Sequence, residues 1–208
     1  MSWRLASRLS VITLALLVVI TVALWELRGS NNGIAATNQN PSALQGTDLG
    51  GISAPDFSLK DQFGKTIKLS QFQGQPVVIT FLYTHCPDVC PLTAEKLHAV
   101  QLQLGKDISK VTMLAVSIDP KGDTRASALK FSQAHKLNSN WHYLIGGKED
   151  LSPVWDAYSI YAQPTSANTS IHTQAIYIID KQGRERLFLN EDFTPAQMTS
   201  NLRVLLGE

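Results

Sequence analysis

The sequence predicts an α/β sandwich that follows an N-terminal transmembrane helix, on the basis of three observations. Short apolar stretches of strand length alternate with amphipathic stretches of helix length over most of the chain. The last elements are two strands joined by a Lys-Gln-Gly turn and one closing helix, which indicates an antiparallel end to the sheet. One long apolar run stands apart near the N-terminus. These features together indicate one α/β domain held at a membrane.

The overall composition gives no sign of a polyanion-binding protein. The chain has 208 residues, of which 44% are hydrophobic and 17% charged, and its 18 basic and 17 acidic residues give a formal net charge of +1. Nucleic-acid-binding domains carry a marked excess of positive charge. We therefore expect no nucleic-acid partner.

The apolar run covers residues 11–25, "VITLALLVVITVALW", in which two threonines are the only polar residues. Extended back to Leu9, it reaches about 17 residues, the lower limit for a helix that spans a bilayer. Arg4 and Arg8 precede it, and this positive charge places the N-terminus in the cytoplasm. Residues 1–28 are therefore predicted to form a membrane anchor.

A cleaved signal peptide is the alternative interpretation of this segment. Its best small-residue pattern, Gly33-Ile34-Ala35, begins farther beyond the apolar run than a cleavage site usually lies. We therefore expect an uncleaved single-pass anchor in the cell (inner) membrane. The rest of the chain is then expected on the extracytoplasmic, periplasmic side.

The remainder of the chain divides into a linker and one domain. Residues 29–50 are small, polar and nearly uncharged, without helix or strand periodicity, which predicts a flexible linker. Residues 51–208 are numerous enough for one domain with a substantial core and too few for two.

The predicted elements of this domain have local justifications. The turn signal "DQFG" at 61–64 separates two short strands. Residues 76–83 and 111–119 are continuous apolar, β-branched and aromatic runs, as expected for strands buried on both faces. Gly105 is a natural end for the helix that follows the first of these runs. In chain order, we expect strands at 54–59, 66–70, 76–83, 111–119, 141–146, 174–180 and 184–189, and helices at 91–105, 124–137, within 148–161 and at 194–206, the last with Thr194 as N-cap and Pro195 in its first turn.

The order of these elements predicts the arrangement of the sheet. A strand, a helix and a second strand make a parallel crossover, whereas the final hairpin and helix make an antiparallel half. A small sandwich with this order fits the thioredoxin-like architecture.

The only two cysteines, Cys86 and Cys90, stand between the first buried strand and the helix after it, in the segment "CPDVCP". Inside a regular helix, Pro91 would clash with the carbonyl group of residue 87, so the helix is predicted to begin at Pro91 with Cys90 near its N-cap. A helix N-terminus carries partial positive charge and free N–H groups, which favour thiolate over thiol. Both sulfurs are thus expected in a turn that promotes reactivity.

The spacing of the two cysteines favours metal binding over a permanent disulfide. Residues four apart on a helical turn have Cβ atoms about 5–6 Å apart, whereas a disulfide requires about 3.5–4.5 Å. A metal ion between the sulfurs tolerates the wider separation, and two thiolates suit Cu(I) or Zn. A disulfide stays open as an alternative if the turn tightens. A purely structural bridge would close a very small loop and stabilise little.

Two sulfur ligands are too few to complete a metal site, so a third ligand is expected among the five histidines. His172 lies just ahead of the predicted strand at 174–180, and in the proposed fold this loop lies beside the start of the first helix. His172 is therefore the candidate third ligand, with a loop histidine of no metal role as the alternative. The other four are expected on the surface, in packing or in a supporting role: His85, His98, His135 and His142.

The segment "FLYTHCPDVCPLT" resembles the copper-binding motif of the Sco/SenC family, whose members are needed for assembly of cytochrome c oxidase. Further stretches agree in order and spacing, namely 54–91, "VSIDP" at 116–120 and "IHTQAIYIIDKQGR" at 171–184. The resemblance covers essentially all of residues 51–208. It implies a thioredoxin-like fold and an N-terminal anchor.

The same resemblance implies three copper ligands, which match Cys86, Cys90 and His172. The chain departs from the family pattern at one neighbouring position. The family's histidine commonly follows an aspartate, whereas here it follows Ile171. Loss of this carboxylate implies a changed copper affinity or redox preference.

Two functions follow from the resemblance. The first is a membrane-anchored copper metallochaperone, whose partners are an oxidase subunit carrying a binuclear copper site and other copper chaperones. The second is a thiol–disulfide oxidoreductase in which Cys86 and Cys90 form the redox pair and keep the acceptor cysteines reduced. Against the second, CxxxC replaces the CxxC of thioredoxins. A peroxiredoxin-like peroxidase is disfavoured because no arginine lies near the motif. Whether the chain is an enzyme is open between these hypotheses.

Overall fold

A computed structural model describes residues 17–22, 25, 43–137, 140–164, 170–172 and 174–208. The chain separates into two compact units, Met1–Pro41 and Ser42–Glu208. In the first unit, residues 17–22 are helical. Over the described part of the chain, no helix combines the length and the apolar character that a membrane crossing requires. Most of the anchor predicted over residues 1–28 lies outside the described residues.

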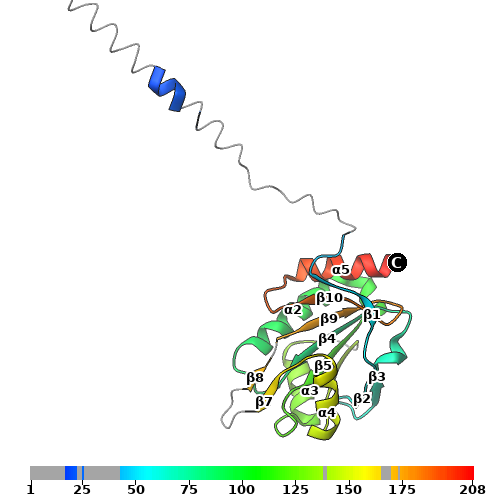
Figure 1. Cartoon of the computed structure of the whole chain (residues 1–208). Helices are drawn as coiled ribbons and strands as arrows, with labels where there is room; N and C mark the ends of the chain where they lie inside the picture. The colour runs from blue at the N-terminus through cyan, green and yellow to red at the C-terminus, as the bar shows by residue number, and fades with distance from the viewer. Residues whose placement is uncertain (1–16, 23–24, 26–42, 138–139, 165–169, 173) are drawn as a thin grey trace, which may run out of the picture. The chain divides into compact units, whose positions relative to one another are not determined.

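The second unit is built on a six-stranded mixed sheet, in the order β1-β10-β9-β4-β5-β6 (Figure 1). The strands β4, β5 and β6 are parallel, whereas β9 is antiparallel to β4, and β10 and β1 continue the antiparallel half. The predicted division into a parallel and an antiparallel half is confirmed. The strands are β1 Thr47–Ser53, β4 Val77–Leu82, β5 Thr112–Ser117, β6 Trp141–Leu144, β9 Ile176–Ile179 and β10 Arg184–Leu189.

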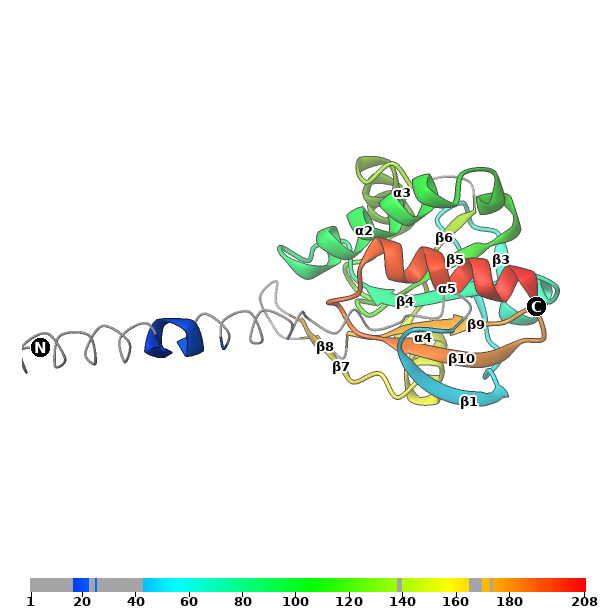
Figure 2. The ribbon, with the colours of Figure 1, turned by 90° about the horizontal axis from the view of Figure 1, so that it is seen from above.

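Four helices cover the two faces of this sheet. Figure 2 shows α2, α3 and α5 on one face and α4 on the other. The crossovers β4-α2-β5 and β5-α3-β6 advance in the same direction along the sheet, and right-handed connections therefore place α2 and α3 on the same side. The predicted α/β sandwich is confirmed. The helices are α2 Val89–Leu104, α3 Arg125–Ala134, α4 Lys148–Ala157 and α5 Pro195–Gly207, with short 3-10 turns η1 Leu69–Phe72 and η2 Gly105–Lys110.

The core lies on both faces of the central strands. Every residue of β4 and β5 is buried, which confirms the prediction made from their continuous apolar runs. On the α4 face, the rings of Phe81 and Tyr158 are 5.9 Å apart. On the opposite face, Phe131 of α3 packs edge-on against Tyr143 of β6, at 5.7 Å between ring centroids.

Two predicted caps and one predicted hairpin are present. The side chain of Thr194 accepts a hydrogen bond from the N–H of Gln197 (3.1 Å), with Pro195 as the first residue of α5. Gly105 ends α2 with a positive φ of 57°. The strands β2, Ser58–Lys60, and β3, Thr66–Lys68, form the expected leading hairpin.

Strand β1 forms where the sequence predicts the end of the linker. It pairs with β10 through an irregular register between Asp48 and Ile52, and Gly50 and Gly51 both have positive φ there. Such a bulge interrupts the side-chain alternation that marks a strand in sequence. The pairing depends on a free edge of β10, which local patterns cannot show.

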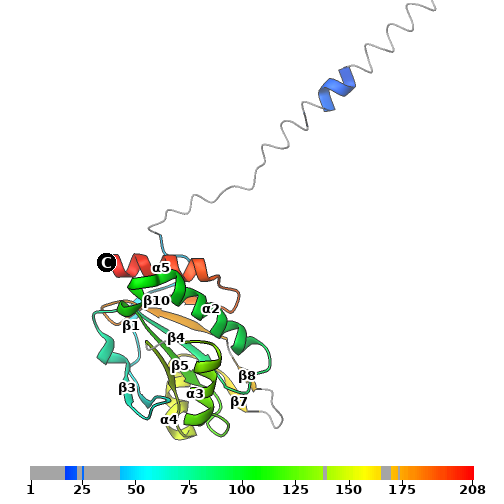
Figure 3. The same cartoon turned by 180° about the vertical axis from the view of Figure 1, so that it is seen from behind.

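A second small ladder was also not predicted. Strands β7, Ala162–Pro164, and β8, Ser170–His172, pair antiparallel in the segment between the helix predicted within 148–161 and the strand predicted at 174–180. Their residues lack the apolar alternation of a half-buried strand. Figures 1 and 3 place this ladder at the same end of the domain as the start of α2.

Candidate functional site

Helix α2 begins earlier than predicted, and this changes the position of one cysteine. The helix starts at Val89 with Asp88 as its N-cap residue, so Cys90 lies in the first turn. The prediction of a start at Pro91 was wrong because first-turn N–H groups have no partner within the helix, so a proline there loses no hydrogen bond. The carbonyl group that the Pro91 ring would contact belongs to residue 87, which precedes the helix. Only Cys86 therefore lies outside α2.

The two thiols lie close together and are nearly closed to solvent. Both cysteines are free, and their exposed fractions are 8% for Cys86 and 0% for Cys90. The backbone N–H of Cys90 points at the sulfur of Cys86, with 3.4 Å between N and Sγ. The first turn of α2 thus supplies an N–H donor to a sulfur, as expected for a helix N-terminus that stabilises a thiolate.

The two sulfurs differ in protonation. A hydrogen bond from the Cys90 thiol lowers the pKa of Cys86 to about 5, against the opposing effect of burial and with help from the N–H groups of Asp88 and Cys90. The pKa of Cys90 is raised, because its proton is held by Cys86, because it is buried and because Asp123 adds negative charge nearby. Cys86 is therefore the thiolate of the pair, and Cys90 is the thiol that donates to it.

Beside the thiols, a buried carboxylate connects three elements of the sheet. Asp123 lies in the loop between β5 and α3 and is 6% exposed. Its Oδ1 accepts hydrogen bonds from the N–H (2.8 Å) and the hydroxyl (2.7 Å) of Thr84, two residues before Cys86. Its Oδ2 accepts from the hydroxyls of Ser117 (2.6 Å) and Tyr143 (3.0 Å). The hydrogen bonds of Asp123 thus hold the loop that carries Cys86 against β5 and β6.

Burial also sets the charge state of this carboxyl group. Burial raises the pKa of Asp123, although hydrogen bonds from Ser117, Thr84 and Tyr143 offset part of that effect. Asp123, Ser117 and Tyr143 were not predicted as site residues. The signal available was the polar segment at the carboxyl end of a buried parallel strand, since such ends meet at one edge of a sheet.

One group of three potential metal ligands occurs among the described residues. Ligand atoms of His85, Asp119 and Asp123 lie within 4.8 Å of one another. However, a carboxylate offers about four acceptor positions, and those of Asp123 already receive four donors. One oxygen of Asp119 likewise accepts from the N–H groups of Lys121 and Gly122. We assign no metal site to this group.

The predicted third ligand is placed only by its backbone. His172 is the last residue of β8 and pairs with Ala162 of β7. Its side chain falls outside the described residues, as does that of Ile171. The structure therefore brings Cys86 and Cys90 together and leaves His172 as a prediction.

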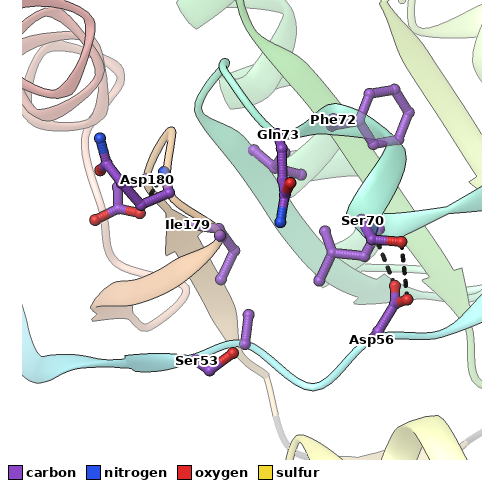
Figure 4. A pocket seen from close by; sticks show the side chains of 12 residues that line it. Ser53, Asp56, Ser70, Phe72, Gln73, Ile179 and Asp180 are labelled. Carbon is purple, nitrogen blue, oxygen red and sulfur yellow. Dashed lines mark hydrogen bonds between the residues drawn. The ribbon is translucent and has the colours of Figure 1, made fainter.

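A cavity lies at the other end of β4, away from the thiol site. It has a volume of about 150 Å³, and its lining includes Val77, Asp56, Ser70 and Asp180 (Figure 4). The lining residues include no cysteine and no histidine. Its carboxylates are engaged by their neighbours, Asp56 by Ser70 and Asp180 by Arg184. This cavity offers no group for metal or thiol chemistry.

Comparison with known proteins identifies the family of this chain. The SCO1/SenC family model matches residues 46–207. The chain is 31% identical over 159 residues to the bovine (Bos taurus) protein SCO2 homolog, mitochondrial, which covers 73% of this chain and 59% of that protein. The mouse (Mus musculus) SCO2 homolog is 28% identical, with 73% and 62% covered. The matched part therefore spans about three fifths of these curated relatives.

Solved structures share the fold. The structure of Bradyrhizobium japonicum ScoI with copper bound is 33% identical, with a TM-score of 0.66 over 74% of this chain and 99% of that chain. A SCO1/SenC family lipoprotein from Bacillus anthracis has a TM-score of 0.70 at 23% identity, over 78% and 99%, and shows the fold alone. The predicted thioredoxin-like sandwich is the fold that these structures share. With a family model matched from β1 to the end of α5 and the CxxxC pair at the expected junction, this chain belongs to the SCO1/SenC family.

Proposed function

We propose that this chain is a membrane-anchored copper metallochaperone that helps to assemble the copper centre of cytochrome c oxidase. Copper is its cargo, held by Cys86, Cys90 and His172. The observation that carries the proposal is the reduced thiol pair at the start of α2, in which one sulfur receives an N–H at 3.4 Å. The copper-bound ScoI, at 33% identity over nearly its whole length, supports it.

The donor set suits copper delivery. Two sulfur ligands and an imidazole match the preferences of Cu(I), a soft ion that tolerates low coordination numbers. Cys86 is already poised as a thiolate, so only the Cys90 proton has to leave when a metal binds. The β7–β8 ladder with His172 lies at the same end of the domain as the thiols (Figures 1 and 3), which supports a shared site.

The cellular arrangement is part of the same proposal. Residues 1–28 anchor the protein in the inner membrane, a linker follows, and the copper-binding domain, which includes β1 from Thr47, lies on the periplasmic side. The acceptor is an oxidase subunit with a binuclear copper site, itself at that membrane face. Other copper chaperones are the proposed sources of the ion.

A second function, thiol–disulfide exchange, is favoured by one specific observation. Cys86 combines a lowered pKa with a neighbouring protonated thiol. Its thiolate would attack an acceptor disulfide and form a mixed disulfide, releasing one acceptor thiolate. Cys90 would then lose its proton to solvent and attack the Cys86 sulfur, which releases the second acceptor thiolate and leaves a Cys86–Cys90 disulfide. Both acceptor sulfurs end reduced, and the pair ends oxidised by two electrons.

Copper titration of the full chain, purified in detergent, tests the metallochaperone. Cu(I) competition assays are expected to show one ion per chain, and Cys86→Ser and Cys90→Ser should abolish high-affinity binding. His172→Ala should weaken affinity by about tenfold to a hundredfold while thermal unfolding is unchanged. His142→Ala is the matched control, because His142 pairs with Asp61 at 3.0 Å in the hairpin region.

The outcomes separate the two functions. Unchanged affinity in His172→Ala would remove the three-ligand site. If wild-type protein reduces an acceptor disulfide but neither binds nor transfers copper, the oxidoreductase function stands in its place.

A further inference from the structure

Beside the thiols, three side chains form a hydrogen-bonded chain that runs from the interior to the surface. We call it the Asp123 relay, and it consists of Asp123, Thr84 and His85. The Thr84 hydroxyl donates to Oδ1 of Asp123 at 2.7 Å. The same hydroxyl lies 3.1 Å from Nδ1 of His85. Asp123 is buried, Thr84 is half-buried and His85 is exposed.

The relay determines which nitrogen of His85 carries a proton. A hydroxyl has one proton, and that of Thr84 is used toward Asp123. The Thr84 oxygen must therefore accept at its second contact, which makes Nδ1 of His85 the donor. In a neutral imidazole the lone pair then lies on Nε2. A buried, four-fold hydrogen-bonded carboxylate thus holds a surface histidine in one tautomer and one orientation.

The surroundings of His85 are open. Its side chain lines a cavity of about 250 Å³ together with Pro91 from α2 and Lys130, Phe131 and His135 from α3. By contrast, the exposed fractions of Cys86 and Cys90 are 8% and 0%. The sulfurs therefore present little surface to an arriving ion. His85, the residue directly before Cys86, presents an imidazole to solvent at the same loop.

We propose that His85 is the capture ligand of the thiol site, which binds copper first and passes it to the sulfurs. The inference rests on the proposed function, because it concerns how copper reaches Cys86 and Cys90. Imidazole nitrogen binds copper and exchanges it readily for thiolate, the softer ligand. His85 does not belong to the final ligand set, and its contribution is to the rate of loading. Thr84 and Asp123 are positioning residues that act through His85.

The ligand exchange is balanced without an added redox partner. A bond forms between Nε2 of His85 and Cu(I) as a bond between copper and the molecule that delivers it breaks. The Cys86 sulfur then binds copper, the Cys90 thiol releases its proton to solvent as its sulfur binds, and the bond to His85 breaks. Copper remains Cu(I) throughout, and no electron is transferred.

Stopped-flow measurement of copper uptake tests the capture ligand. The full chain in detergent is mixed with Cu(I) held by a bathocuproine chelator, and loss of the chelate colour is followed. His85→Ala is expected to slow uptake by about tenfold with equilibrium affinity changed less than about twofold, while Thr84→Val causes a smaller slowing that Thr84→Ser restores. His135→Ala is the matched control, since this histidine lines the same cavity outside the relay, and its uptake rate should equal that of wild type.

A measurement on the copper-free protein tests the relay independently. Nitrogen-15 NMR should show His85 protonated at Nδ1 in wild type and a mixture of tautomers in Thr84→Val. Equal uptake rates in His85→Ala and wild type would overturn the capture role, and so would a loss of affinity as large as the loss of rate. A wild-type protein that takes up no copper would instead overturn the proposed function itself, and an Nε2-protonated His85 would overturn the relay.

Discussion

At each end of strand β4, an aspartate accepts hydrogen bonds from both the N–H and the hydroxyl of one serine or threonine. We call this pair of hydrogen bonds the motif, and it is buried at one end and exposed at the other. At the carboxyl end, Asp123 accepts the N–H and the hydroxyl of Thr84 at 2.8 and 2.7 Å. At the amino end, beside the cavity of Figure 4, Asp56 accepts the N–H and the hydroxyl of Ser70 at 2.9 and 2.8 Å. Asp123 is buried and Asp56 is exposed. The chemistry of the two pairs is therefore matched, and their burial is not.

Burial changes what the motif does. Burial is the largest single influence on both carboxyl groups, and it raises the pKa of Asp123. At Asp56, the hydrogen bonds from Ser70 and Phe57 and the charge of Lys68 together outweigh it and lower the pKa. Asp123 also receives hydroxyls from two further strands, so it fastens a loop to the sheet, while Asp56 stabilises a surface turn. A cavity of about 250 Å³ lies beside His85 at the thiol end, and the cavity of about 150 Å³ lies at the end without thiols.

At the carboxyl end of β4, the two thiols should differ strongly in their rates of alkylation. In the reduced protein, iodoacetamide labelling of Cys86 should reach half of its maximal rate near pH 5, because the pKa of Cys86 is lowered to about 5. Cys90 should stay unlabelled in the folded protein, since it is fully buried and its pKa is raised. Peptide mass spectrometry gives both rates, and Asp56→Asn should leave them unchanged. Equal labelling of the two cysteines would contradict the assigned roles.

Removal of each carboxylate is expected to have unequal costs. Asp123→Ala leaves the buried hydroxyls of Ser117 and Tyr143 and the half-buried hydroxyl of Thr84 without their acceptor, which should cost about 3 kcal/mol or more of the free energy of unfolding. Asp56→Ala should cost about 1 kcal/mol or less, because water can replace an exposed acceptor. Urea denaturation measures both. Similar losses at the two positions would mean that burial does not distinguish the motifs.

Removal of one hydroxyl donor at each end of β4 should have smaller costs, which also differ with burial. Ser117 is fully buried, donates to Asp123 at 2.6 Å and accepts from the N–H of Asp119 at 3.1 Å. Ser117→Ala should cost about 1.5 kcal/mol, and the equivalent Ser70→Ala about 0.5 kcal/mol. Urea denaturation again gives the difference. A larger cost for Ser70→Ala would reverse the proposed ranking.

The smallest effect is a difference in pH trend. Because the pKa of Asp123 is raised in the folded state, the folded protein binds the proton more tightly than the unfolded chain, and its carboxylate contributes less stability as pH rises above 3.8. For Asp56, whose pKa is lowered, stability is present above 3.8 and is lost as pH falls. From pH 3 to pH 7, the stability of wild type relative to Asp123→Asn should therefore fall, and relative to Asp56→Asn it should rise. Parallel trends in urea titrations would contradict this sign.

Local sequence patterns predict much of the fold because the relevant forces are local. Continuous apolar runs identify β4 and β5, whose residues are all buried. Thr194 and Pro195 identify the start of α5. Strands β1 and β7 were missed because their pairing partners, rather than their own side chains, hold them in the extended conformation.

The thiol site was predictable in part for the same reason. The pair Cys86 and Cys90, at the junction of a buried strand and a helix, can be read from order and spacing. The exact start of α2 cannot, since a proline is accepted in the first turn. Asp123 lies far along the chain from Thr84, and the two meet because β4 and β5 are parallel neighbours whose carboxyl ends share one edge.

Residue order and spacing alone establish an α/β domain with two thiols at a helix start and a resemblance to copper-binding relatives. The assignment of Cys86 as the thiolate and Cys90 as the donor, and the orientation of His85 by Asp123 through Thr84, come from the folded domain. This division arises because periodicity, helix starts and caps depend on residues within a few positions of one another. Protonation and orientation depend on burial and on groups that meet only when the sheet has formed.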